Sequence, residues 1–154
     1  MSVDVEGAGG RAEGTPFFRI DDLQVQFQTD DGTVRAVDGV SYSVERGKTL
    51  AVVGESGSGK SVTANAVMGL LDSRQATVTG SAVLDGEDLV QASTDRLREL
   101  RGSRMSMVFQ DPLSSLHPFY TIGRQLTEAV QTKRDVDKSE ARDRALQMLD
   151  RVGI

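Results

Sequence analysis

Eight residues, from Gly54 to Ser61, have the types and the spacing needed to hold a phosphate group. Their sequence is GESGSGKS, which matches G-x-x-x-x-G-K-[ST] in full. Glycines let the backbone curl so that successive N–H groups point at phosphate oxygens. The Lys60 ammonium can reach the β- and γ-phosphates of a nucleotide, and the Ser61 hydroxyl can coordinate Mg²⁺. The pattern therefore predicts ATP and Mg²⁺ as ligands.

The alternative is a flexible Gly/Ser linker that ends in Lys by chance. With average glycine usage of about 7%, such a match arises in roughly half a per cent of chains this long. The setting also favours a phosphate loop, because an apolar run at 49–53 precedes it and a predicted helix at 60–71 follows it. We expect the carboxylate of Glu55 to face away from the phosphates. The predicted nucleotide contacts are Gly54, Glu55, Ser56, Gly57, Ser58, Gly59, Lys60, Ser61 and Val62.

Two kinds of strand pattern surround the loop. Alternating apolar residues, with an interruption near Asp21–Asp22, predict antiparallel sheet in the first fifty residues, with strands at 17–28, 33–37 and 40–44. Continuous apolar runs at 49–53 and 105–109 predict strands that are covered on both faces, as in a parallel sheet. A further strand is expected at 77–84, with Asp85–Gly86 as its turn.

Helices are predicted mainly in the second half of the chain. A short one spans 94–100 with Thr94 as its N-cap, and a longer one spans 121–133 after an exposed loop at 111–120. Asp137 and Glu140 form a D-x-x-E capping box for the last helix, which Gly153 is expected to end. Residues 1–15 are rich in Gly, Ala and Glu and are expected to be a disordered leader.

Composition limits the classes of function. The chain has 154 residues and a formal net charge of −5, so we expect no nucleic-acid partner. It has no cysteine, which excludes disulfides and thiolate metal sites and fits a reducing compartment. We find no signal peptide and no run near the roughly 20 apolar residues that a membrane span needs. Work at a membrane would require a partner that supplies the membrane part.

Beyond the phosphate loop, three stretches make the chain resemble the ATP-binding subunits of ABC transporters, in the oligopeptide/dipeptide (peptide/nickel) importer branch. They are RAVDGVSYSVERGKTLAVVGESGSGKS, GSAVLDGEDL and RMSMVFQDPLSSLHPFYTIGRQLTEAV. The resemblance covers about 18–154 and implies an α/β P-loop NTPase fold of the ABC type. It implies an N-terminal antiparallel β subdomain, a partial parallel core sheet and, from about residue 121, the beginning of a helical subdomain. The domain is thus expected over 16–154.

The resemblance also assigns roles to two residues outside the loop. Gln110 matches the Q-loop glutamine, which in the family contacts Mg²⁺ and the attacking water and relays the nucleotide state to the membrane subunits. A surface Gln at a strand end is the alternative. Phe27 matches the position of an aromatic residue that stacks on adenine, and a core Phe of a strand accounts for it equally well.

Two residues imitate catalytic groups. Asp85 ends an apolar strand, as the Mg²⁺-associated Asp of a Walker B motif does, but Gly86 follows and no Glu does, so a hairpin turn is the better interpretation. His117 is the one histidine of the chain, but the family's switch histidine lies far downstream. We expect His117 to be a residue of the loop surface.

Several parts of the family's ATPase site are missing from the sequence. It contains no LSGGQ-like signature, no Walker B Asp–Glu pair and no switch histidine. We therefore expect the chain to be the N-terminal portion of a subunit. A complete subunit would be a translocating ABC-type ATPase, whereas this chain is expected to bind ATP weakly and not to hydrolyse it appreciably.

The resemblance thus favours an energy-coupling ATP-binding subunit of an importer for peptides or similar small solutes. It implies transmembrane permease subunits, a second ATP-binding subunit, an extracytoplasmic solute-binding protein as an indirect partner, and a peripheral position at the cytoplasmic face of the cell membrane. A non-catalytic nucleotide-binding or regulatory fragment is the alternative. A soluble P-loop kinase or GTPase fits less well, because no N-K-x-D run is present.

Overall fold

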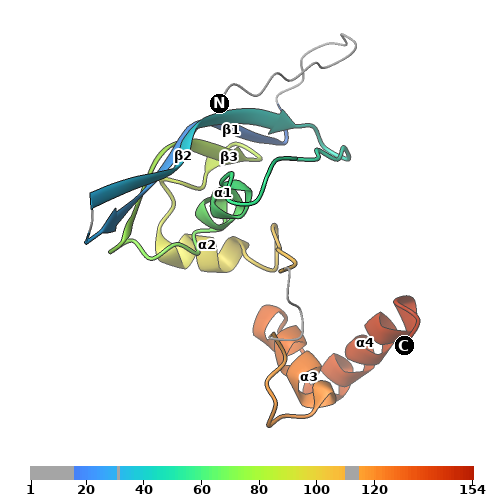
Figure 1. Ribbon diagram of the computed structural model, residues 1–154. Helices are drawn as coiled ribbons and strands as arrows, with labels where there is room; N and C mark the ends of the chain where they lie inside the picture. Colours follow the sequence, from blue (N-terminus) through green and yellow to red (C-terminus); the bar gives the residue numbers. More distant parts are fainter. Residues whose placement is uncertain (1–15, 31, 110–114) are drawn as a thin grey trace. The chain divides into compact units, whose positions relative to one another are not determined.

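The computed structural model describes residues 16–30, 32–109 and 115–154, and the chain divides between Arg98 and Glu99 into two compact units (Figure 1). The first unit contains an antiparallel sheet and α1 (Lys60–Val67). The division falls within the last turn of the short helix α2 (Thr94–Leu100). The second unit contains a helical hairpin.

The sheet of the first unit has the strand order β2-β1-β3-β4, and every neighbouring pair is antiparallel. This confirms the predicted antiparallel sheet, although the strands predicted at 33–37 and 40–44 form one continuous strand. The strands are β1 (Phe18–Thr29), β2 (Gly32–Val44), β3 (Ala76–Leu84) and β4 (Glu87–Asp88).

An irregularity interrupts β1 where the sequence predicted one. The pairing of β1 with both of its neighbours shifts register next to Asp22, which has a positive φ of 45°. The Asp22 N–H donates to the Ser41 hydroxyl oxygen at 2.8 Å instead of continuing the ladder. On the other side, a Cβ at Gly80 would collide with the Asp22 carbonyl, so only glycine fits beside the bulge.

Apolar side chains from the sheet, α1 and α2 form the core of the first unit. Helix α1 contacts β1 and β2 (Figure 1), and the largest fully buried side chains all come from the central strand β1. Burial of this kind is the main stabilising contribution in a unit of this size. The core residues are Ile20, Leu23, Val25, Val37, Ala66, Ala76, Ala82, Leu84, Leu89 and Leu97.

The predicted turn at Asp85–Gly86 is confirmed. Both residues have positive φ values, 52° and 88°, as a tight two-residue hairpin between β3 and β4 requires. The Asp85 carboxylate accepts a hydrogen bond from Arg46 at 3.0 Å. This Asp is therefore a turn residue with a structural partner, as the sequence interpretation held.

The two strands predicted from continuous apolar runs are not strands in this structure. Residues 49–53 have no regular structure, and 105–109 contribute only an isolated bridge between Arg101 and Met105. Within the part of the chain that the structure describes, nothing else pairs with these runs. Val53 and Val108 are 88% and 90% exposed. The prediction of buried parallel strands is wrong here because a strand needs neighbours to satisfy its backbone and cover its faces.

The second unit is built on two helices, α3 (Ile122–Lys133) and α4 (Lys138–Arg151), which contact each other. Asp137 caps α4, since its carboxylate accepts from the Glu140 N–H at 2.9 Å, as the capping box predicted. Gly153, with φ of 83°, lies just past the end of α4, and the Ile154 N–H donates to the Leu149 carbonyl.

The remaining helix boundaries refine the predictions. Helix α1 ends at Val67 rather than at residue 71. The Ser93 hydroxyl accepts from the Arg96 N–H, so Ser93 and not Thr94 caps α2. Among the described residues, no helix is both long enough and apolar enough to cross a membrane.

Candidate functional site

The predicted phosphate loop lies between the irregular segment 49–53 and the start of α1. Helix α1 begins at Lys60, and Gly59 is its N-cap with a left-handed φ of 87°. No side chain caps this helix, in contrast to α3 and α4. The first N–H groups of a helix carry partial positive charge and lack intrahelical partners, so this end of α1 is suited to an anion.

Two glycines of the loop have a close neighbour where a Cβ would lie. Gly59 has a positive φ, and a Cβ there would lie 2.5 Å from the Ala36 carbonyl oxygen of β2. Gly54 is restricted by the loop itself, since its Cβ would lie 2.8 Å from the Ser58 hydroxyl oxygen. Both contacts are shorter than real Cβ atoms make, but the Ala36 carbonyl is fixed backbone whereas the Ser58 hydroxyl can rotate away. Only Gly59 therefore requires glycine on steric grounds.

The Lys60 side chain folds back over the loop. Its ammonium donates to the Gly54 carbonyl at 2.8 Å, to the Glu55 carbonyl at 2.7 Å and to the Ser58 hydroxyl oxygen at 3.1 Å. These contacts join the first and last residues of the loop and place a positive charge at the start of α1. The arrangement concentrates a cation and a helix N-terminus at one place, which is the chemistry of a phosphate site.

Thr63 supports the loop, and sequence reasoning missed it. Its hydroxyl donates to the Gly59 carbonyl at 3.0 Å and its N–H donates to the same oxygen at 2.8 Å. The side chain is only 7% exposed. A Thr four residues after the last glycine, in the first turn of a predicted helix, was the available signal.

Glu55, Ser61 and Val62 also belong to the predicted site, and their contact with a nucleotide stays a prediction. The Glu55 carbonyl accepts from the Ser58 N–H at 3.2 Å in addition to Lys60, so Glu55 contributes its backbone. Ser61 is exposed in the first turn of α1, and Val62 is half-buried beside it.

Two residues of the predicted site, Phe27 and Gln110, lie outside the loop. Phe27 lies in β1, opposite Val34 of β2 and Ala76 of β3, and is half-buried. That position suits a strand residue, and its contact with adenine stays a prediction. Gln110, the predicted Q-loop residue, lies outside the described residues.

The described residues contain no group of three or more His, Asp or Glu side chains that could hold a metal ion by themselves. Mg²⁺ prefers oxygen ligands and usually keeps waters and substrate phosphates in its coordination shell. The Ser61 hydroxyl is an exposed oxygen in the first turn of α1.

In the second unit, His117 belongs to an exposed turn, as predicted for a loop-surface residue. Its ring stacks on Tyr120 with the ring centroids 4.7 Å apart. The side-chain amide of Gln125 holds the turn by three hydrogen bonds: it accepts from the His117 N–H and donates to the His117 and Tyr120 carbonyls. Phe119, at the tip of this turn, is 87% exposed.

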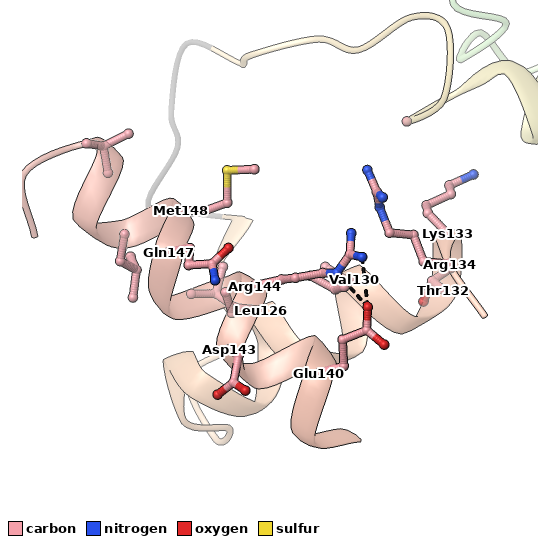
Figure 2. Close-up of a pocket in the computed structure, with 15 residues that line it drawn as sticks. Leu126, Val130, Thr132, Lys133, Arg134, Glu140, Asp143, Arg144, Gln147 and Met148 are labelled. Carbon is pink, nitrogen blue, oxygen red and sulfur yellow. Dashed lines mark hydrogen bonds and ion pairs between the residues drawn. The ribbon is translucent and has the colours of Figure 1, made fainter. Parts of the chain in front are cut away.

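The second unit also has a groove of about 1270 Å³ along α3 and α4 (Figure 2). Leu126, Val130 and Met148 contribute apolar lining, and the Glu140–Arg144 ion pair lies at 2.7 Å among the lining residues. An i,i+4 pair of this kind is a common feature of a helix surface. The groove contains no cluster of side chains suited to catalysis.

Comparison with known proteins agrees with the chemistry of the loop. The sequence profile of the ABC transporter family matches residues 37–154. A putative peptide import ATP-binding protein of Brucella abortus (strain 2308) is 46% identical over 139 residues, covering 90% of this chain and 42% of that protein. The dipeptide transport ATP-binding protein DppD of Escherichia coli (strain K12) is 43% identical over 135 residues, covering 88% and 41%.

Solved structures give the fold. A dimeric ATP-binding cassette in a post-hydrolysis state, bound to ADP and Pi, aligns with a TM-score of 0.71 at 22% identity, covering 86% of this chain and 56% of that one. A dimeric bacterial ABC transporter cassette aligns with a TM-score of 0.70 at 21% identity, with the same coverage. The chain therefore has the fold of an ABC cassette over the part that aligns.

The chain matches only part of the length of these relatives. The chain spans about 42% of the Brucella relative and 41% of the Escherichia coli relative. The match nevertheless includes the whole phosphate loop, α1 and the helical hairpin, since the family profile runs from residue 37 to residue 154. The chain belongs to the ABC transporter family.

Proposed function

We propose that this chain is the phosphate-binding portion of an ATP-binding, energy-coupling subunit of an ABC importer for peptides or similar small solutes. The observation that carries the proposal is the geometry of Lys60, whose ammonium is held over the loop at the uncapped start of α1. The substrate class rests on the relatives, which are named for peptide and dipeptide import.

Each loop residue would have a separate role in binding ATP. Lys60 would pair with the β- and γ-phosphates, while the backbone N–H groups of the loop and of the first turn of α1 would donate to their oxygens. The Ser61 hydroxyl and Gln110 would hold Mg²⁺, which neutralises phosphate charge when it is bound. Thr63 keeps the end of the loop attached to α1.

Hydrolysis requires more than these residues provide. A water has to be positioned and polarised, and the charge that develops around the γ-phosphate has to be stabilised. Lys60, Ser61 and Gln110 supply part of the charge stabilisation, but the sequence has no Walker B Asp–Glu pair to polarise the water. We therefore propose ATP binding, with little or no turnover by this chain alone.

The partners follow from the same proposal. Permease subunits would lie in the membrane, with this subunit peripheral at the cytoplasmic face, and an extracytoplasmic solute-binding protein would deliver the solute. A second ATP-binding subunit is supported by the dimeric state of the two aligned cassettes. The exposed turn around Phe119, followed by α3, would face the permease; Leu116, Tyr120 and Ile122 are also exposed there, at 42%, 45% and 46%.

The binding proposal is tested by equilibrium titration of the chain with ATP and ADP in the presence of Mg²⁺. Lys60→Ala removes the ammonium and is expected to weaken binding at least about tenfold, as loss of a charge-assisted contact to phosphate should. Lys48→Ala is the matched control, because Lys48 is an exposed lysine outside the loop. Equal affinity of the wild type and Lys60→Ala would refute the assignment.

The coupling role is tested by co-purification of the complete subunit with its permease subunits. Phe119→Ala is expected to reduce recovery of the complex, because an exposed aromatic residue on a fixed turn is a typical interface anchor. Val34→Ala is the control, since Val34 is an exposed apolar residue of the first unit. If the chain has a non-catalytic, regulatory role instead, it would bind nucleotide in the first test, and no permease would co-purify in the second.

A further inference from the structure

The ammonium of Lys60 has no hydrogen-bonding capacity left in this structure. An ammonium has three N–H donors, and Lys60 makes three hydrogen bonds, to the Gly54 and Glu55 carbonyls and to the Ser58 hydroxyl oxygen. A phosphate oxygen that enters the loop can bind Lys60 only if one of these three acceptors gives up its place. The identity of that acceptor determines how the loop accepts a nucleotide.

The three acceptors differ in strength and in freedom to move. The two carbonyls accept at 2.8 and 2.7 Å and are part of the backbone, so they cannot turn away without changing the course of the loop. The Ser58 hydroxyl accepts at 3.1 Å, the longest of the three contacts. It is exposed and can leave by rotation about a single side-chain bond. Ser58 is therefore the acceptor that is displaced at least cost.

We propose that Ser58 is a positioning residue whose hydroxyl competes with phosphate oxygens for the Lys60 ammonium and is displaced when a nucleotide binds. This inference rests on the proposed function, since it concerns the same site. Its consequence is that Ser58 competes with the ligand. Removal of the hydroxyl should leave one Lys60 donor satisfied only by water, which a phosphate displaces more easily.

The first test is the affinity of the Ser58→Ala chain for ATP, ADP and AMP. Loss of one competing hydrogen bond is expected to tighten ATP and ADP binding about two- to fivefold. AMP, which lacks the phosphates that Lys60 reaches, should bind with unchanged affinity. Ser58→Thr keeps a hydroxyl on Lys60 and should tighten ATP binding less than Ser58→Ala does. Ser73→Ala, an exposed serine in the turn before β3, controls for the Ser-to-Ala change itself.

The second test uses the chain without nucleotide. The rate at which an amine-reactive reagent acylates Lys60, followed by mass spectrometry, should rise about two- to fivefold in Ser58→Ala. The rate at Lys48 in the same sample is the internal reference. A rate at Lys60 that Ser58→Ala leaves unchanged would show that the hydroxyl does not hold the ammonium.

The outcomes separate this inference from the proposed function. Wild-type binding together with an equal or weaker affinity of Ser58→Ala for ATP and ADP overturns the inference and leaves the proposed function intact. Absence of nucleotide binding by the wild-type chain overturns the proposed function. In that case the acylation rates alone decide whether Ser58 holds Lys60.

Discussion

At the scale of single residues, the shape of the phosphate loop depends on Gly59, Lys60 and Thr63. Gly59 combines a left-handed backbone with a neighbouring strand that leaves no room for a Cβ. Lys60 and Thr63 then fix the two sides of the loop by hydrogen bonds to its backbone carbonyls. Loop shape and ligand chemistry are therefore set by the same short segment.

Gly59→Ala should destabilise the first unit and disable the loop. A non-glycine residue at φ of 87° costs about 1–3 kcal/mol, and the contact with the Ala36 carbonyl adds to that cost. Chemical denaturation followed by circular dichroism measures the loss. Gly86→Asn is the control, because Gly86 also has a positive φ but has open space where a Cβ would lie, and asparagine tolerates that conformation. Equal stability of both variants would contradict this account of Gly59.

Thr63→Val tests the support of the loop at nearly constant volume. The substitution removes the hydroxyl that donates to the Gly59 carbonyl. Thr63 is only 7% exposed, so water cannot easily replace this hydrogen bond. The free energy of unfolding should fall by about 1 kcal/mol, and the affinity for ATP should fall with it. Thr63→Ser keeps the hydroxyl and should retain more of the affinity. Identical nucleotide affinity in wild type and Thr63→Val would exclude a supporting role.

At the scale of elements, local patterns predicted structure well wherever the element's partners are close in the sequence. The sheet of β1, β2 and β3, its turn at Asp85–Gly86 and the capping of α4 by Asp137 were all predictable from alternation, turn residues and caps. The loop itself was predictable because its contacts are local: Lys60 donates to the Gly54 carbonyl within the same seven residues.

The two predicted strands that did not form share one physical cause. The apolar runs at 49–53 and 105–109 indicate a preference for burial, but a strand forms only where another segment pairs with it. No described segment pairs with 49–53, so the side chains of Val52 and Val53 stay exposed. Separate strands were also predicted at 33–37 and 40–44, on either side of Asp38–Gly39. The backbone of β2 nevertheless continues through both residues.

The cap of α4 gives a prediction at the same scale. Asp137→Ala removes the acceptor of the Glu140 N–H and should destabilise the helical hairpin by about 1 kcal/mol. Circular dichroism during thermal denaturation measures the effect. Asp135→Ala changes the charge equally two residues earlier, outside the helix, and should have a smaller effect. A larger loss for Asp135→Ala would contradict the capping assignment.

At the scale of the whole molecule, the described residues leave large apolar side chains in contact with water. Val53, Val108, Phe119 and Ile154 are each more than four-fifths exposed. Apolar surface of this extent, together with unpaired strand-forming segments, favours association with other chains. We expect the isolated chain to bind a hydrophobic dye and to self-associate with increasing concentration. Light scattering coupled to size-exclusion chromatography measures the self-association, and fluorescence measures dye binding. A chain that stays monomeric at high concentration and binds no dye would contradict this expectation.

The central claim, that the loop from Gly54 to Ser61 is a nucleotide-phosphate site, is tested most directly by an NMR titration of the chain with ADP and Mg²⁺. The account predicts that amide shifts change chiefly in residues 54–62, and that Lys60→Ala abolishes these changes while Lys48→Ala preserves them. Shift changes that avoid the loop, or that persist unchanged in Lys60→Ala, would contradict it.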